Sequence, residues 1–196
     1  MPKNFTRIYF LAFGTLDLIA LVVAFIYSLK VIDIYFSYFT VLSNILATFV
    51  FLIYGFGFKS KLVNRLYGPS VLYMSITGVV FWTILRNHHL VASVPWITIV
   101  MHGVMPIVVF LSWVFSSTKL KLVYKDAFIW QVFPLFFVVY TLIRGPFVHW
   151  YPYFFLNPGR VGGYLGVSKY VIFILVGSYL LSLALIWIRN SKKKFF

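Results

Sequence analysis

The chain contains no cysteine and no glutamate, and only three of its 196 residues are acidic. Without cysteine it cannot be a small secreted scaffold held together by disulfides. Charged residues make up 10% of the chain, whereas a soluble domain carries about 25%. Apolar residues make up 62%, which excludes a disordered chain. The composition therefore indicates an integral membrane protein.

Long uncharged segments recur along the chain, as this class requires. A helix needs about 20 mainly apolar residues to cross the hydrocarbon core of a bilayer. The first such segment is too long for the apolar part of a cleavable signal peptide. We therefore predict an all-α, polytopic membrane protein with six transmembrane helices in one bundle, forming a single domain over residues 1–196. The predicted spans cover residues 5–29, 36–56, 69–85, 97–115, 127–143 and 168–188.

The basic residues are distributed unequally between the two sides of this predicted topology. Twelve of the 17 Lys and Arg residues fall in the termini and in the second and fourth connections. The positive-inside rule then places both termini in the cytoplasm, and we expect a bacterial plasma membrane. The net charge of +14 indicates contact with anionic membrane lipids, because the basic residues lie between apolar segments instead of forming one nucleic-acid-binding face. We expect no nucleic-acid partner.

Polar side chains follow one face of the second predicted span. Ser37, Thr40, Asn44 and Thr48 recur at intervals of three, four and four residues, with Ser43 beside them. This spacing places them on one side of a helix. Such residues commonly form hydrogen bonds between packed transmembrane helices. The alternative, a functional site in the outer leaflet, is about equally well supported for the group as a whole.

His102 is the one histidine inside a predicted span. The fourth span runs in the same direction as the second, so His102 lies at about the depth of Thr40. A neutral imidazole is a good proton acceptor. Pro106 has no N–H, and it therefore leaves the carbonyl of His102 without its helical partner. Taken alone, His102 is better explained as a histidine that is hydrogen-bonded in a packed interface.

A third group of polar residues occurs where the fifth span ends. Tyr140 and Arg144 are four residues apart and share a helix face, and the loop beyond them contains His149 and Tyr151. Arg144 either extends to the lipid headgroups or holds an anionic group such as a carboxylate. By topology, we expect these residues to converge with Thr40, Asn44 and His102 in the outer third of the membrane.

Other polar residues give weaker signals. Asp17 lies near the middle of the first span, where an ionised carboxylate costs about 2.5–3.5 kcal/mol. Thr48 and Thr77 should lie at a similar depth and are its candidate partners, so a structural role is favoured. His88 and His89 are adjacent but have no clear third ligand. His102 also lacks a second histidine for haem, and we expect no metal and no cofactor.

Three segments together resemble a known family. They are Tyr38-Phe39-Thr40-Val41-Leu42-Ser43-Asn44, the His102-x-x-x-Pro106 pair followed by Trp113, and Tyr140-Thr141-Leu142-Ile143-Arg144-Gly145 followed by Trp150-Tyr151-Pro152-Tyr153-Phe154-Phe155-Leu156. In combination they resemble the prokaryotic six-transmembrane protein family. That family is distantly similar to the eukaryotic androgen-induced and androgen-dependent membrane proteins.

The resemblance implies a specific chemistry. The eukaryotic relatives are threonine-dependent hydrolases that act on fatty acid esters of hydroxy fatty acids. By this resemblance, Thr40 corresponds to the nucleophile and His102 to the base. No acidic residue is predicted at their depth, so we expect a dyad that hydrolyses a lipid ester, with a fatty-acyl ester as substrate. The expected substrate-binding residues are Ser43, Asn44, Tyr140, Arg144, His149 and Tyr151.

A non-enzymatic function remains open at this point. The same polar residues would suit a membrane protein that binds or transports a lipid or another small molecule. Such a protein should keep its ligand when Thr40 is changed to alanine and lose it when Arg144 is changed to alanine. The inverted repeats and broken helices that transporters usually show are not clear in this sequence.

Overall fold

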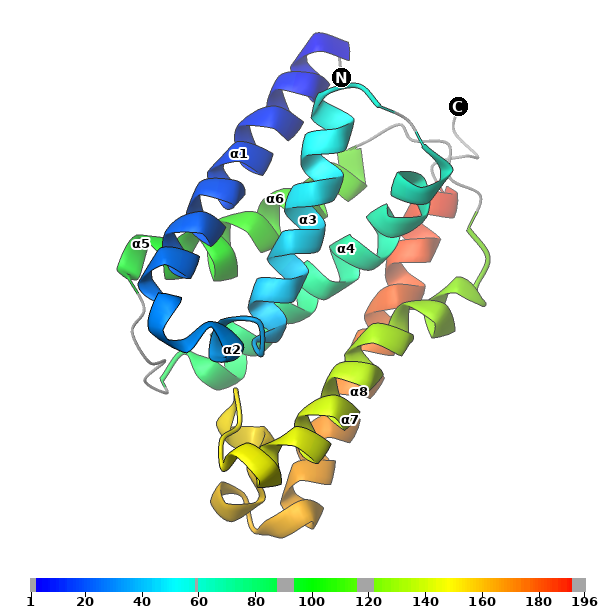
Figure 1. Ribbon diagram of the computed structural model, residues 1–196. Helices are drawn as coiled ribbons and strands as arrows, with labels where there is room; N and C mark the ends of the chain where they lie inside the picture. Colours follow the sequence, from blue (N-terminus) through cyan, green and yellow to red (C-terminus); the bar gives the residue numbers. More distant parts are fainter. Residues whose placement is uncertain (1–2, 59, 88–93, 116–121, 192–196) are drawn as a thin grey trace. The chain divides into compact units, whose positions relative to one another are not determined.

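The computed structural model describes residues 3–58, 60–87, 94–115 and 122–191, and this part of the chain consists of helices and turns without any strand (Figure 1). The chain divides into two compact units, Met1–Lys121 and Leu122–Phe196. We describe each unit by itself. The all-helical class predicted from composition is therefore confirmed for the described residues.

Within the described residues, five helices are long and apolar enough to cross a membrane, and a bent pair of helices brings the number to as many as six. This agrees with a membrane protein of about six spans. The sixth is the pair Leu29–Tyr35 and Phe39–Gly55, whose two parts meet at 88°. The other five are Thr6–Tyr27, Lys61–Leu85, Pro95–Phe115, Asp126–Val148 and Gly163–Ser191.

The first unit contains helices α1 to α6 (Figure 1). Helix α1 packs along α3, α3 packs against α4, and α4 packs against α6. Two π-helical turns, η2 and η3, follow α4 and α5 without a break. The bounds are α1 Lys3–Tyr27, η1 Leu29–Val31, α2 Ile32–Tyr35, α3 Phe39–Gly55, α4 Lys61–Val80, η2 Phe81–Leu85, α5 Pro95–Ile99, η3 Val100–Val104 and α6 Met105–Phe115.

Small residues allow α1 and α3 to pack closely. A Cβ atom on Gly55 would lie 2.7 Å from the Leu11 side chain, and one on Gly14 would lie 3.0 Å from Leu52. Close approach of this kind is typical of helix packing in membranes. The contact fixes which residues of α1 lie opposite which residues of α3, and it places Asp17 level with Thr48.

The predicted start of the third span at Pro69 is wrong. Helix α4 begins eight residues earlier, at Lys61, and Ser60 caps it by accepting the Val63 N–H. Pro69 lies inside this helix. The hydropathy pattern does not include the first two turns of this helix, because they contain Lys61, Asn64 and Arg65.

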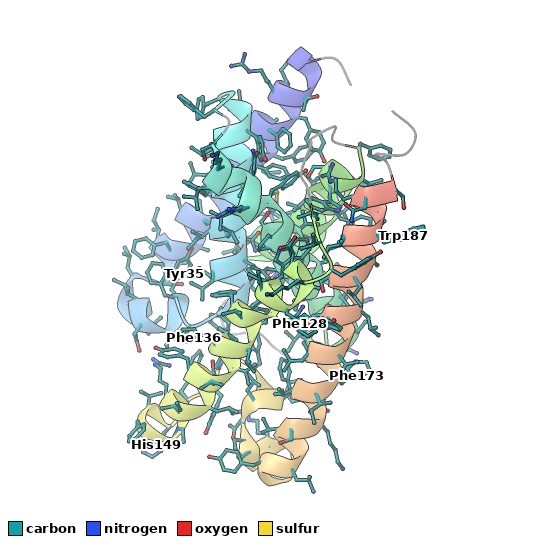
Figure 2. All side chains as sticks on the ribbon, turned by 90° about the vertical axis from the view of Figure 1, so that its right-hand side faces the viewer. Tyr35, Phe128, Phe136, His149, Phe173 and Trp187 are labelled. Atoms are coloured by element: carbon teal, nitrogen blue, oxygen red, sulfur yellow. The ribbon has the colours of Figure 1, made fainter. Side chains whose placement is uncertain are left out.

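The second unit is a hairpin of two long helices, α7 (Asp126–Val148) and α8 (Gly163–Ser191). The aromatic segment between them folds into two short 3-10 turns, η4 (Phe154–Leu156) and η5 (Pro158–Arg160). Its rings pack on each other and on Tyr170 of α8. Figure 2 shows Phe173 and Trp187 pointing outward from α8, and both are largely exposed in the described chain, as expected for side chains that face lipid.

Candidate active site

Thr40 and His102 lie in contact in the first unit. Thr40 is in the first turn of α3, and its Oγ1 is 3.2 Å from Nε2 of His102, which belongs to the π-helical turn η3. The side chain of Thr40 is 7% exposed. A separation of this size is within the range that a nucleophile and its base require. The structure thus brings together the two residues that the sequence paired.

The second ring nitrogen of His102 fixes the direction of this contact. Nδ1 lies 3.1 Å from the carbonyl oxygen of Thr98, one turn earlier. A carbonyl only accepts, so the proton of the neutral ring belongs on Nδ1. Nε2 then carries a lone pair and accepts the hydroxyl proton of Thr40. The ring also packs on Phe81, with the ring centres 4.2 Å apart.

The neighbours of Thr40 on α3 bind its backbone. Asn44 is fully buried, and its Nδ2 donates to the Thr40 carbonyl at 2.7 Å and to the Met101 carbonyl at 3.4 Å. Ser43 Oγ donates to the same Thr40 carbonyl at 3.0 Å and pairs with Thr77 Oγ1 at 2.8 Å. Both hydrogens of the Asn44 amide are therefore directed at backbone, and a substrate role for Ser43 and Asn44 stays a prediction.

Trp82 is a residue near this site to which sequence reasoning gave no role. It lies in η2, and its Nε1 donates to the carbonyl of His102 at 3.0 Å. The predicted effect of Pro106 was the one available signal, because a carbonyl freed from its helix needs a donor from elsewhere. The sequence alone could not indicate which residue would supply that donor.

Asp17 has one of its two predicted partners. Thr48 Oγ1 donates to Asp17 Oδ2 at 2.8 Å, whereas Thr77 is paired with Ser43 instead. Asp17 is fully buried, and its Oδ1 has no hydrogen-bond partner in the described part of the chain. The Asp17–Thr48 contact therefore joins the middle of α1 to α3, as the structural interpretation of Asp17 predicted.

We expect Thr48→Val to lower the free energy of unfolding by about 1–2 kcal/mol, because it removes the donor to a buried carboxyl group. The double variant Asp17→Leu/Thr48→Val should lose less than the sum of the two single variants, since no polar group is then left unsatisfied. Unfolding of the protein in lipid–detergent mixtures measures these values. Thr83→Val is the matched control, because the Thr83 hydroxyl bonds only within its own helix. Additive losses would contradict the assigned contact.

The remaining predicted site residues lie in the second unit. Tyr140 is about half exposed on α7, and the Arg144 guanidinium lies 5.9 Å from the centre of the Trp150 ring. His149 ends α7 in a left-handed conformation, with φ of 51°, and Figure 2 shows it at the tip of that helix. Since the two units are described separately, the convergence of these residues with Thr40 and His102 stays a prediction.

Tyr151 packs on the helix that carries Arg144. Its ring lies directly against Gly145, so that a Cβ atom there would collide with the ring. Burial raises the pKa of the Tyr151 phenol, and so do the charge of Tyr164 and a hydrogen bond to it. The phenol therefore stays protonated at neutral pH and remains able to donate a hydrogen bond.

Metal ligands do not gather in the described part of the chain. Within residues 3–58, 60–87, 94–115 and 122–191, no three His, Cys, Asp or Glu residues form a possible metal site. His88 and His89 lie outside the described residues.

Comparison with known proteins gives no match for this chain among protein-family models, curated proteins or solved structures. The resemblance drawn from the sequence motifs therefore stays an expectation.

Proposed function

We propose that this protein is a membrane hydrolase of lipid esters, with Thr40 as the nucleophile and His102 as the general base. The observation that carries the proposal is the contact of 3.2 Å between Thr40 Oγ1 and His102 Nε2, with Nδ1 held by the Thr98 carbonyl. Threonine is a weak nucleophile unless a base removes its proton. The neutral imidazole is here oriented to do so.

The reaction would proceed through an acylated threonine. Thr40 Oγ1 attacks the ester carbonyl carbon, and its proton passes to His102 Nε2. The bond from the carbonyl carbon to the alcohol oxygen then breaks, and Nε2 protonates the departing alcohol. Water attacks the acyl group next, gives a proton to Nε2, and the fatty acid leaves as that proton returns to Thr40.

A backbone carbonyl takes the orienting role that a carboxylate has in a catalytic triad. The Thr98 oxygen fixes the ring tautomer and faces the positive charge that appears on His102 when it accepts a proton. The proposal thus needs no acidic residue, in accord with the scarcity of acids in the chain. Both amide hydrogens of Asn44 are engaged with backbone carbonyls, so Asn44 is not assigned as a donor to the oxyanion.

The location of the pair favours a lipid as substrate. Thr40 lies in the first turn of α3, and His102 lies eight residues into the apolar segment Pro95–Phe115. His102 is thus near the start of a helix that is apolar enough to cross a membrane, and Thr40 directly follows the 88° bend of the helix pair that is apolar enough only when taken together. With both termini in the cytoplasm, as the basic residues predict, the pair would lie in the outer leaflet of the plasma membrane.

Covalent labelling tests the proposal directly. The protein, reconstituted in lipid nanodiscs, is treated with an alkyl fluorophosphonate, and the modified residue is identified by mass spectrometry. We expect the adduct on Thr40, together with turnover of a panel of fatty-acyl esters. An unlabelled protein, or an adduct on another hydroxyl, would overturn the proposal. Ligand binding that survives Thr40→Ala but not Arg144→Ala would favour the binding or transport alternative.

A further inference from the structure

Two carbonyl groups in the helical turn around His102 lie opposite a residue that has no backbone N–H. In this π-helical turn the Met105 N–H bonds to the Val100 carbonyl, five residues earlier. The next residue is Pro106, which has no N–H to donate. Pro106 would be the partner of Met101 in the π-helical spacing and of His102 in the α-helical spacing. Neither carbonyl can therefore accept a hydrogen bond from the backbone of residue 106.

Side chains from two other segments donate to these carbonyls. Asn44 Nδ2, on α3, reaches the Met101 carbonyl at 3.4 Å while it also holds the Thr40 carbonyl at 2.7 Å. Trp82 Nε1, on η2, reaches the His102 carbonyl at 3.0 Å. The backbone on both sides of the imidazole is thereby tied to neighbouring helices. Asn44 in addition links the backbone of the nucleophile to the residue that precedes the base.

We propose that Trp82 is a positioning residue, whose indole N–H holds the backbone of His102 so that Nε2 stays within reach of the Thr40 hydroxyl. This inference rests on the proposed function. The effect is plausible in size, because misplacing a catalytic group by about 1 Å can cost roughly 100-fold in rate. Trp82 itself touches neither substrate nor the reacting atoms in this role.

The contacts of Trp82 distinguish this role from that of a membrane anchor. A tryptophan in the interfacial belt directs its N–H to headgroups or water. Here the ring is 49% exposed, yet the N–H is directed inward to the His102 carbonyl. Phe81, the preceding residue, packs on the imidazole ring itself. Two consecutive residues of η2 thus hold the ring and the backbone of the same histidine.

Trp82→Phe tests the role, because phenylalanine keeps an aromatic ring and lacks the N–H. We expect the rate of fluorophosphonate labelling at Thr40 to fall roughly 10- to 100-fold. Trp96→Phe, an exposed tryptophan of α5, is the matched control and should label at the parent rate. A Trp82→Phe protein that labels as fast as the parent would overturn the inference.

A second measurement separates this inference from the proposed function. In protein labelled with ¹⁵N-histidine, the ring nitrogens of His102 should report the Nδ1-protonated tautomer in the parent. Trp82→Phe should shift these signals toward a mixture of tautomers, and Trp96→Phe should not. If the parent is never labelled by fluorophosphonate, the proposed function fails, but the nitrogen signals still decide whether Trp82 positions His102. Unchanged signals would refute the positioning role.

A third measurement needs no variant and applies even if Trp82→Phe does not fold. The indole hydrogen of Trp82 should exchange with deuterium more slowly than that of Trp96, because it is held in a hydrogen bond. Equal exchange of the two indole hydrogens would overturn the inference.

Discussion

Replacing Thr40 with alanine is expected to abolish fluorophosphonate labelling and to reduce ester hydrolysis by at least about 1000-fold, to the background of the buffer. The change removes the one hydroxyl that lies 3.2 Å from Nε2 of His102. It leaves the backbone bonds from Ser43 and Asn44 to residue 40 in place, because these use the carbonyl oxygen. The fold should therefore persist, and the loss should be one of chemistry.

Two further variants serve as controls for Thr40→Ala. Thr40→Ser keeps a hydroxyl within reach of His102 and should retain a measurable rate of labelling and hydrolysis. Thr83→Ala removes a threonine hydroxyl whose bond is to its own helix, and it should leave the rate unchanged. Rates are measured on proteins shown to be folded by their elution and thermal midpoint. Hydrolysis by Thr40→Ala at the parent rate would remove Thr40 from the mechanism.

Composition and hydropathy were sufficient to predict the fold class. Uninterrupted apolar segments leave few alternatives to membrane-spanning helices, and five to six such helices are present. Hydropathy does not reveal whether the helix bends within an apolar segment. The bend of 88° before Phe39 separates two apolar pieces that a hydropathy window joins. The first two turns of α4 lie outside the predicted span, because their charged and polar residues have the composition of a loop.

The sequence predicts one common depth for the residues of the candidate site, but it does not predict the contacts between them. Topology placed Thr40 and His102 at one depth, but only the packing of α3 against η3 decides that the two side chains face each other. Asp17 was correctly matched with Thr48, yet Thr77 bonds to Ser43 instead. The depth of a residue limits which hydroxyl groups can contact it, and the rotation of each helix about its axis decides which one does.

The contacts of His102 depend on irregular helical turns, which the periodicity of the sequence does not predict. Pro106 indicated that the His102 carbonyl lacks its helical partner, and the π-helical turn places a second carbonyl opposite the same proline. π-helical turns are rare and occur frequently at functional sites. The described part of the first unit has two such turns, and they meet at the imidazole: His102 belongs to one, and Phe81 of the other packs on its ring. Sequence propensity does not predict their position.

Replacing His102 with glutamine is expected to lower the rate of Thr40 labelling by about 100- to 10,000-fold, the contribution that general-base catalysis usually makes. Glutamine is polar and can still form a hydrogen bond with the Thr40 hydroxyl, but its amide does not accept a proton at neutral pH. The variant therefore separates loss of the base from loss of the contact. A labelling rate close to that of the parent would show that His102 serves only in packing.

The pH dependence of labelling supplies the internal control for His102→Gln. Only the neutral imidazole accepts the proton of Thr40, so the rate in the parent should fall as the pH is lowered through the pKa of His102 and reach a plateau above it. In the glutamine variant the low remaining rate should lose this dependence, because no group titrates at that position. His102→Ala leaves space beside Phe81, and added imidazole should restore part of its rate with the same pH dependence as the parent. A parent rate that does not change with pH, or an alanine variant that imidazole fails to restore, would argue against a base at this position even if both variants are slow.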